Sequence, residues 1–230
     1  IAPFAKHVRE GRPWVRLKLA ASLDGRIGSA KGVSKWITGP DARRSVHALR
    51  TRVDAVAVGI GTALADDPAL TVRDAEPIDG RSQPTRVVFD ANARLPLDAL
   101  LVRTAREVPT WLVVADDAET AALEHAGVRV LRVPRGSAGV DLDAALAALG
   151  REGIVDLLVE GGAKLAGALM AGDHLDELRW FVAPIALGAE GLASLVGPSP
   201  ESPEQAPRYV LNRVERLGND AALTLLRQRS

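Results

Sequence analysis

The chain has 230 residues, and its 29 Lys and Arg residues balance its 29 Asp and Glu residues, so the formal net charge is zero. This balance excludes a general electrostatic attraction to nucleic acid or to an anionic membrane, and any anion-binding site must therefore be local. The lack of cysteine excludes disulfides, thiolate catalysis and cysteine-ligated zinc. The four histidines show no metal-ligand spacing, so we predict no metal site.

The N-terminal residues do not have the pattern of a signal peptide, and apolar runs stay well short of the roughly 20 residues that a membrane helix requires. We therefore expect a soluble, cytoplasmic protein. Because residue 1 is isoleucine rather than methionine, we expect the chain to be either processed or the downstream part of a longer protein.

The first predicted element is a strand at residues 14–20. Val15, Leu17 and Leu19 alternate with Arg16 and Lys18, and this period of two places both cations on the face opposite the apolar side chains.

A helix is predicted to begin at residues 39–41, with an apolar stripe at helical spacing and a cationic stripe beside it. Taken alone, such a cationic stripe is usually a solvated helix face. The apolar stripe consists of Ala42, Val46 and Leu49, and the cationic stripe of Arg43, His47 and Arg50.

Short apolar strands then alternate with helices, which predicts a mostly parallel α/β sheet flanked by helices on both faces. The predicted strands cover residues 54–59, 86–90, 110–115, 128–133 and 155–160, and the predicted helices cover residues 118–126, 143–149 and 162–171.

The last third of the chain changes character. Residues 177–183, 208–216 and 221–228 indicate strands without helices between them, and the last two are joined by a turn at 218–220. The sheet should therefore end in an antiparallel C-terminal hairpin. Residues 188–207 are rich in proline and glycine and are predicted to form a surface loop.

Polar clusters follow four of the predicted strands, at residues 22–26, 59–73, 90–94 and 160–162. Ligands of open α/β sheets bind outside the carboxyl ends of the strands, so these clusters are the candidate site. The double glycine at 161–162 has neither the dinucleotide-binding nor the P-loop spacing, and an isolated Gly-Gly is more often a packing turn.

Two ionisable residues lie on predicted central strands. Burying the Lys18 ammonium or the Glu160 carboxylate in a covered sheet is costly unless a cleft or a partner receives the charge. The two residues are therefore a candidate pair for proton handling.

Several motifs in this order carry a resemblance to a known family. Residues 18–26 (KLAASLDGR), 34–40 (SKWITGP), 59–68 (GIGTALADDP) and 159–162 (VEGG), with 165–167, closely resemble the reductase domain of the bacterial bifunctional riboflavin-biosynthesis deaminase/reductase. The match spans essentially the whole chain.

The resemblance implies a dihydrofolate reductase-like fold, with an entry segment at residues 1–13 and a reductase domain at residues 14–230. It also implies an NADPH-dependent oxidoreductase. The implied reaction reduces the ribose of 5-amino-6-(5-phosphoribosylamino)uracil, a phosphorylated pyrimidine, to the ribityl chain of 5-amino-6-(5-phosphoribitylamino)uracil. A homodimer is also expected.

Position by position, the resemblance implies two sets of contacts. The substrate contacts are Ser34, Arg50, Leu70, Arg73 and Glu160, of which Arg50 and Arg73 suit the phosphate. The cofactor contacts are Ala20, Trp36, Thr62, Asp66, Ala91, Gly162, Ala163, Lys164, Leu165, Ala166, Gly167 and Ala168.

For proton handling, Lys18 and Glu160 are the first candidates and Asp66 is the next. Some relatives place a nucleotide-contacting serine at position 91, where this chain has alanine, and Asn92 or Arg94 is then the candidate substitute for binding the 2′-phosphate.

The bifunctional members of this family carry an upstream zinc deaminase domain, whose H-x-E and P-C-x-x-C motifs do not occur in these 230 residues. We expect such a domain to precede this chain, with a free-standing reductase as the alternative. Two rival functions stay open at this point: a dihydrofolate-type or other small-heterocycle reductase, and a non-catalytic nucleotide-binding regulator.

Overall fold

The computed structural model describes residues 1–73, 83–137 and 139–228. The chain divides into two units, which are described separately below. The first consists of Ile1–Trp14 and Ala48–Val159, and the second of Val15–His47 and Glu160–Ser230.

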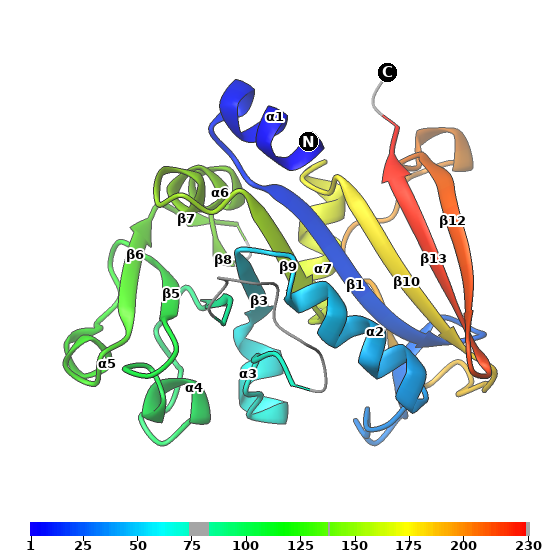
Figure 1. The fold of residues 1–230 in the computed structure, drawn as a ribbon, viewed down its shortest axis with the longest axis horizontal. Helices are drawn as coiled ribbons and strands as arrows, with labels where there is room; N and C mark the ends of the chain where they lie inside the picture. The colour runs from blue at the N-terminus through cyan, green and yellow to red at the C-terminus, as the bar shows by residue number, and fades with distance from the viewer. Residues whose placement is uncertain (74–82, 138, 229–230) are drawn as a thin grey trace. The chain divides into compact units, whose positions relative to one another are not determined.

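The first unit is built on a parallel sheet of five apolar strands (Figure 1). Their order is β9 (Asp156–Glu160), β3 (Ala55–Gly59), β4 (Thr85–Phe89), β5 (Thr110–Ala115) and β6 (Arg129–Val133). Neighbouring strands all pair in parallel, which confirms the prediction from the alternating strands and helices. Each strand begins or ends within one residue of its predicted limits.

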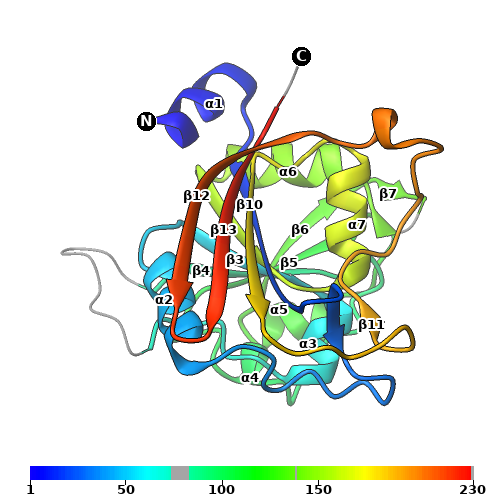
Figure 2. The ribbon, with the colours of Figure 1, turned by 90° about the vertical axis from the view of Figure 1, so that its right-hand side faces the viewer.

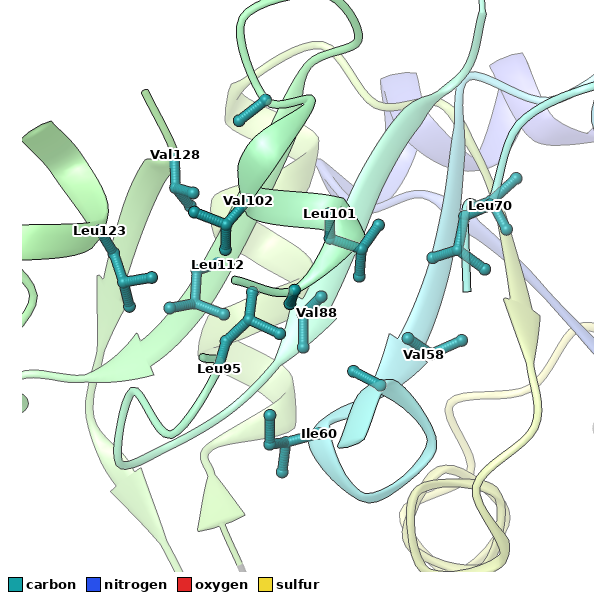
Figure 3. Close-up of a cluster of buried hydrophobic side chains, with 14 of the residues drawn as sticks. Val58, Ile60, Leu70, Val88, Leu95, Leu101, Val102, Leu112, Leu123 and Val128 are labelled. Carbon is teal, nitrogen blue, oxygen red and sulfur yellow. The ribbon is translucent and has the colours of Figure 1, made fainter. Parts of the chain in front are cut away.

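Helices α3 (Ile60–Asp66), α4 (Leu100–Arg103) and α5 (Ala121–His125) contribute to a buried apolar cluster with strands β3, β4 and β5. Figure 3 shows Leu101, Val102 and Leu123 in this cluster with Val88 and Leu112. The alternate strand residues, such as Val87 and Val113, are also fully buried, so both faces of the sheet are covered.

Helix α6 (Leu142–Arg151) contacts β6, and helix α1 (Ala2–Glu10) lies in the expected entry segment. A short hairpin, β7 (Arg135–Gly136) and β8 (Gly139–Val140), follows β6. The sequence patterns did not predict α1, α3 or α4, and α5 is shorter than its predicted limits.

The second unit contains strands in the order β12 (Tyr209–Leu217), β13 (Asp220–Arg227), β10 (Glu177–Ala183) and β1 (Trp14–Ser22). β1 and β10 are parallel, whereas β13 is antiparallel to both β10 and β12. This arrangement confirms the predicted C-terminal antiparallel hairpin, which Figure 2 shows side by side with β10.

Two helices belong to this unit in whole or in part, α2 (Pro40–Arg50) and α7 (Ala163–Ala171), and α2 begins where it was predicted. The predicted loop at 188–207 is mostly irregular, but it contains β11 (Leu192–Ala193), which pairs with β2 (Arg26–Gly28), and a short 3-10 helix at Pro203–Gln205. In the described part of the chain, every helix is too short or too polar to cross a bilayer.

Candidate active site

The alternation predicted for β1 is confirmed, because Val15, Leu17 and Leu19 are buried and the residues between them are half-buried. The Lys18 ammonium lies 5.8 Å from the centre of the Phe181 ring on neighbouring strand β10, which is a cation–π geometry. Lys18 is thus held on the sheet face opposite the apolar core.

Further charges share the sheet face of Lys18. Arg16 and Arg179 both contact the carboxylate of Glu177, the latter through its Nε at 2.6 Å. In the strand register Lys18 stands opposite Arg179, so three cations and one carboxylate are adjacent on this face.

Asp24 ties together the loops that follow β1 and β10. Its carboxylate accepts hydrogen bonds from the Ser22 hydroxyl at 2.6 Å and from the Leu187 and Gly188 backbone N–H groups at 3.0 and 2.7 Å. The Ser22 hydroxyl, followed by the Leu187 N–H, lowers the pKa of Asp24 to about 2. The strand-end position was recognised in the sequence, but this role of Asp24 was not.

Trp36 lies between β2 and α2 and is 71% exposed. The guanidinium of Arg43 stacks 4.6 Å from its ring centre and also donates a hydrogen bond to the Thr38 carbonyl at 2.8 Å. An indole as exposed as this suits a planar ligand. Ser34, in the same loop, and Ala20, two residues after Lys18 on β1, are both half-buried.

Both glycines of the double-glycine turn have a backbone reason to be glycine. Gly161 has φ +84° and Gly162 has φ +91°, a region that side chains disfavour. Gly162 is the N-cap of α7, which begins at Ala163, one residue later than predicted, and no side chain caps it. The positive φ thus accounts for glycine at position 162 whether or not a phosphate binds there.

The rest of the predicted cofactor segment lies in α7. Gly167 packs against the backbone of Val196, and a side chain there would clash with the Val196 carbonyl. The Val196 N–H donates to the Ala163 carbonyl at 2.9 Å, and Ala166 is fully buried. Packing alone thus accounts for Ala166 and Gly167, and their cofactor contact stays a prediction. Ala163, Leu165 and Ala168 are half-buried, and Lys164 is exposed.

In the first unit the structure brings Arg50 to the segment that holds two other predicted substrate contacts. Arg50 is buried at the end of α2, and its Nη1 donates to the Thr71 carbonyl at 2.6 Å. Leu70, which is buried with φ +52°, and the exposed Arg73 flank this carbonyl. Residues 74–82, which follow, lie outside the described residues.

Thr62 and Asp66 lie on α3, directly after β3, and both are half-buried. Their spacing of four residues puts them on one helix face. The cluster at residues 59–73 was predicted only as polar residues after a strand end. In the structure, residues 60–66 of this cluster form helix α3.

The turn after β4 is built around Asp90, whose buried carboxylate accepts the Leu95 N–H at 2.9 Å. Burial raises the pKa of Asp90. Ala91 is half-buried, and the exposed Arg94 has its Nε 3.6 Å from the Asp90 carboxylate.

Arg135 joins three strand ends, although the sequence patterns did not single it out. It follows β6 and donates to Asn92 after β4 at 2.8 Å and to Asp117 after β5 at 2.6 Å. This hydrogen bond from Arg135 lowers the pKa of Asp117. No signal in the local sequence predicts the contact, because its partners are 43 and 18 residues away.

The predicted residues thus fall into two groups, one in each unit. The second unit holds Lys18, Ala20, Ser34, Trp36, Glu160 and residues 162–168, and Glu160 is half-buried at the end of β9. The first unit holds Arg50, Thr62, Asp66, Leu70, Arg73 and Ala91. Among the residues that the structure describes, no group of His, Asp and Glu side chains is arranged to hold a metal ion.

Comparison with known proteins places the chain in a family. The model of the RibD C-terminal domain matches residues 13–223. The chain belongs to the RibD C-terminal domain family. This confirms the resemblance read from the ordered motifs.

Three members illustrate the likeness. A 2,5-diamino-6-ribosylamino-4(3H)-pyrimidinone 5′-phosphate reductase of Methanothermobacter thermautotrophicus is 39% identical over 212 residues, which are 91% of this chain and 95% of the relative. The structure of Acinetobacter baumannii RibD has a TM-score of 0.87 and 35% identity, covering 99% of this chain and 62% of that one.

The third is the Thermotoga maritima diaminohydroxyphosphoribosylaminopyrimidine deaminase/5-amino-6-(5-phosphoribosylamino)uracil reductase. Its TM-score is 0.79 and its sequence identity is 26%, and the match covers 99% of this chain and 60% of that one. The chain spans 58% to 62% of the length of the curated RibD relatives. The A. baumannii and T. maritima structures share the α/β fold with a mostly parallel sheet, as predicted.

Proposed function

We propose that this RibD C-terminal domain reduces the ribose of 5-amino-6-(5-phosphoribosylamino)uracil to a ribityl chain, with NADPH as the hydride donor, in riboflavin biosynthesis. The observation that carries the proposal is likeness over the whole domain to reductases named for this substrate or its close analogue. The motifs at the ends of β1, β3 and β9 support it, because ligands of α/β sheets bind there.

The reaction needs ring opening, hydride transfer and a proton. The glycosylamine opens to an imine as the ring oxygen takes up a proton, and hydride then adds to the sugar carbon, so that the net reaction consumes one hydride and one proton. NADPH supplies the hydride when bound. We assign the proton handling to Lys18 and Glu160, with Asp66 as the next candidate, and the substrate phosphate to Arg50 and Arg73.

Several local features support binding of a phosphorylated dinucleotide. The uncapped N-terminus of the nine-residue helix α7 suits a diphosphate, and the exposed Trp36 suits a planar ring. We assign the 2′-phosphate of the cofactor to Asn92 or Arg94, and the hydrogen bond from Arg135 to Asn92 supports this by fixing the turn after β4.

The proposal includes the setting of the reaction. We place it in the cytoplasm and in a homodimer, and we propose that a deaminase domain accompanies the reductase, as the name of the T. maritima protein describes for that protein. The greater length of the RibD relatives supports this last point.

A second substrate is favoured by one specific observation. The M. thermautotrophicus relative is named for the 2,5-diaminopyrimidinone analogue, which carries an amino group where the uracil has an oxygen. The proposal is tested by mixing the purified chain with NADPH and each pyrimidine, or with dihydrofolate, and following cofactor absorbance. Oxidation of NADPH with dihydrofolate alone, or with none of the three substrates, would contradict the proposal.

The same assay tests the two proton-handling residues. Lys18→Met and Glu160→Gln keep approximate size and remove charge, so turnover should fall by about 100-fold or more while NADPH binding persists. Lys31→Met and Glu190→Gln, which change exposed residues outside the candidate site, should leave turnover unchanged. Near wild-type turnover in both site variants would show that Lys18 and Glu160 are structural.

A further inference from the structure

The backbone that carries Arg135 is fixed by a short, closed hairpin. β7 and β8 pair Arg135 with Val140, whose side chain is buried. A side chain at Gly136 would clash with the Val140 carbonyl, so glycine lets the two strands approach closely. The Asp141 N–H closes the base of the hairpin by donating to the Pro134 carbonyl at 2.9 Å. Arg135 is therefore an exposed side chain on an anchored backbone.

The turn after β4, which carries Asn92, is fixed as well. The Ala91 carbonyl accepts the N–H of Ala115, at the end of β5, at 3.1 Å. Within the turn the Ala93 N–H donates to the Asp90 carbonyl at 3.1 Å. Asn92 is thus an exposed side chain on a rigid turn at the carboxyl ends of the strands, where ligands of α/β sheets bind.

The hydrogen bond between Arg135 and Asn92 sets the direction of the Asn92 amide. Arg135 Nη1 donates to Asn92 Oδ1 at 2.8 Å. Because a guanidinium has donors only, Asn92 must turn its carbonyl oxygen toward Arg135. The Nδ2 group of Asn92, which carries two N–H donors, then lies on the side away from Arg135. Such donors suit a phosphate oxygen.

Arg135 also offsets a carboxylate close to this amide. Its Nη2 donates to Asp117 Oδ1 at 2.6 Å, and the Asp117 side chain is 69% exposed. Asp116 and Glu119 lie in the same segment after β5 and are also exposed. Without Arg135 this segment would present only negative charge, and an unpaired carboxylate beside a phosphate weakens binding.

The Arg135 guanidinium keeps donors for a ligand of its own. Nη1 and Nη2 each spend one hydrogen on Asn92 and Asp117, while Nε and the second hydrogens of Nη1 and Nη2 remain. The Arg135 side chain is 44% exposed, so solvent and ligands reach it. A phosphate beside Asn92 would therefore meet both amide and forked guanidinium donors.

We propose that Arg135 makes this domain prefer a cofactor with a phosphorylated ribose, because it directs the Asn92 amide to the 2′-phosphate and neutralises Asp117 beside it. The inference rests on the proposed function, since it takes NADPH as the cofactor. Specificity is a difference between two affinities, and Arg135 acts on both. Without it, Asp117 would repel the 2′-phosphate and would accept hydrogen bonds from the hydroxyls of an unphosphorylated ribose. Arg135 is thus a specificity-determining residue with no part in hydride transfer.

The test measures binding of two cofactor fragments by calorimetry, without turnover. The fragments 2′,5′-ADP and 5′-AMP differ only in the 2′-phosphate, and the wild type should bind 2′,5′-ADP at least about tenfold more tightly. Arg135→Met should remove most of this preference and change the affinity for 5′-AMP by less than about twofold. Adding Asp117→Asn to Arg135→Met should restore part of the preference, because the repelling carboxylate is then gone.

Arg151→Met is the matched control. Arg151 is an exposed arginine of the same unit, but it ends α6 directly before β9 and so lies at the opposite edge of the sheet. It should leave both affinities unchanged. Arg135 is exposed, so its variants should fold, as far-UV circular dichroism would show. Arg135→Lys is a milder variant that keeps the charge without the fork, and it should lose part of the preference.

A wild type without preference for 2′,5′-ADP, an unchanged preference in Arg135→Met, or an equal loss of both fragments would each overturn the role of Arg135. Failure of the proposed function would look different. A chain that prefers 2′,5′-ADP through Arg135, but oxidises NADPH with neither pyrimidine, would keep this inference and lose the proposed reaction. An active reductase that binds both fragments equally would keep the reaction and lose the inference.

Discussion

At the scale of single residues, Arg86 shows how far a tertiary role can depart from its local pattern. In the sequence it is only the first residue of an apolar strand. In the structure its guanidinium is almost fully buried and donates hydrogen bonds to the backbone carbonyls of Leu101, Thr104 and Val108, at 3.3, 3.0 and 2.7 Å. It also donates to the Thr104 hydroxyl at 2.8 Å. Burial lowers the pKa of Arg86 to about 10, so it stays charged at neutral pH.

Replacing Arg86 should therefore be costly. Arg86→Met keeps much of the volume but removes the hydrogen bonds that the buried guanidinium donates to three carbonyls and to the Thr104 hydroxyl. Each hydrogen bond of a charged group contributes about 1.5 to 3 kcal/mol. We expect the free energy of unfolding in urea to fall by at least about 3 kcal/mol. Arg103→Met, at an exposed position of α4, should change it by less than about 0.5 kcal/mol. A loss below about 1 kcal/mol for Arg86→Met would refute the structural role.

Asp24 makes a pH-dependent contribution to stability. Its folded pKa of about 2 lies below the ordinary value of 3.8, so between these values the folded state binds fewer protons than the unfolded state. The stabilisation is present above about pH 4 and is lost as the pH falls toward 2. Asp24→Asn should therefore lower the melting temperature at pH 6, and the difference from wild type should shrink at pH 2 to 3. A difference independent of pH would exclude this linkage.

At the scale of elements, a glycine at the start of α7 can have two distinct reasons, a backbone conformation with positive φ and the space that a bound phosphate needs. Because Gly162 has a positive φ, any side chain there strains the backbone whether or not a phosphate binds nearby. A bulky substitution at this position would thus change both the stability of the fold and the affinity for the ligand, and the two effects could not be distinguished. The N-terminal position of α7 itself, Ala163, offers a cleaner probe.

Ala163→Asp should weaken NADPH binding without weakening the fold. A carboxylate in the first turn interacts favourably with the helix dipole, but it repels a diphosphate at the same amides. We expect the dissociation constant measured by calorimetry to rise at least tenfold, which corresponds to about 1.4 kcal/mol. Ala171→Asp, at the exposed far end of the same helix, is the control and should leave the affinity unchanged. Equal affinities in both variants would place the cofactor phosphates elsewhere.

The longer elements were predictable because their patterns are local. The five parallel strands of the first unit, the helix at α2 and the C-terminal hairpin all lie within a few residues of the predicted limits. Helices α3 and α4 were missed because seven and four residues are too few to show a helical period. Such short helices are stabilised by the packing of residues such as Ile60 and Leu101 into the core, not by their own propensity.

At the scale of the whole molecule, the candidate site could be predicted only in part. Motifs past the strand ends indicated where ligands bind, and the family resemblance supplied residue identities. Asp24 and Arg135 were not predicted in their roles, since the first contacts Leu187 and Gly188 more than 160 residues away, and the second joins turns after three different strands. Contacts at this separation depend on how the chain returns to the same sheet edge.

By itself, the sequence determined the family, the strand-and-helix order and which side chains share a face, because these follow from ordered motifs and from periods of two and 3.6 residues. Only the tertiary structure decided which face is covered. Thr224 and Leu223 alternate in β13, and nothing in the alternation shows that the threonine would be buried and the leucine left half-open. Burial depends on what packs against a face, and that is set by residues distant in the chain.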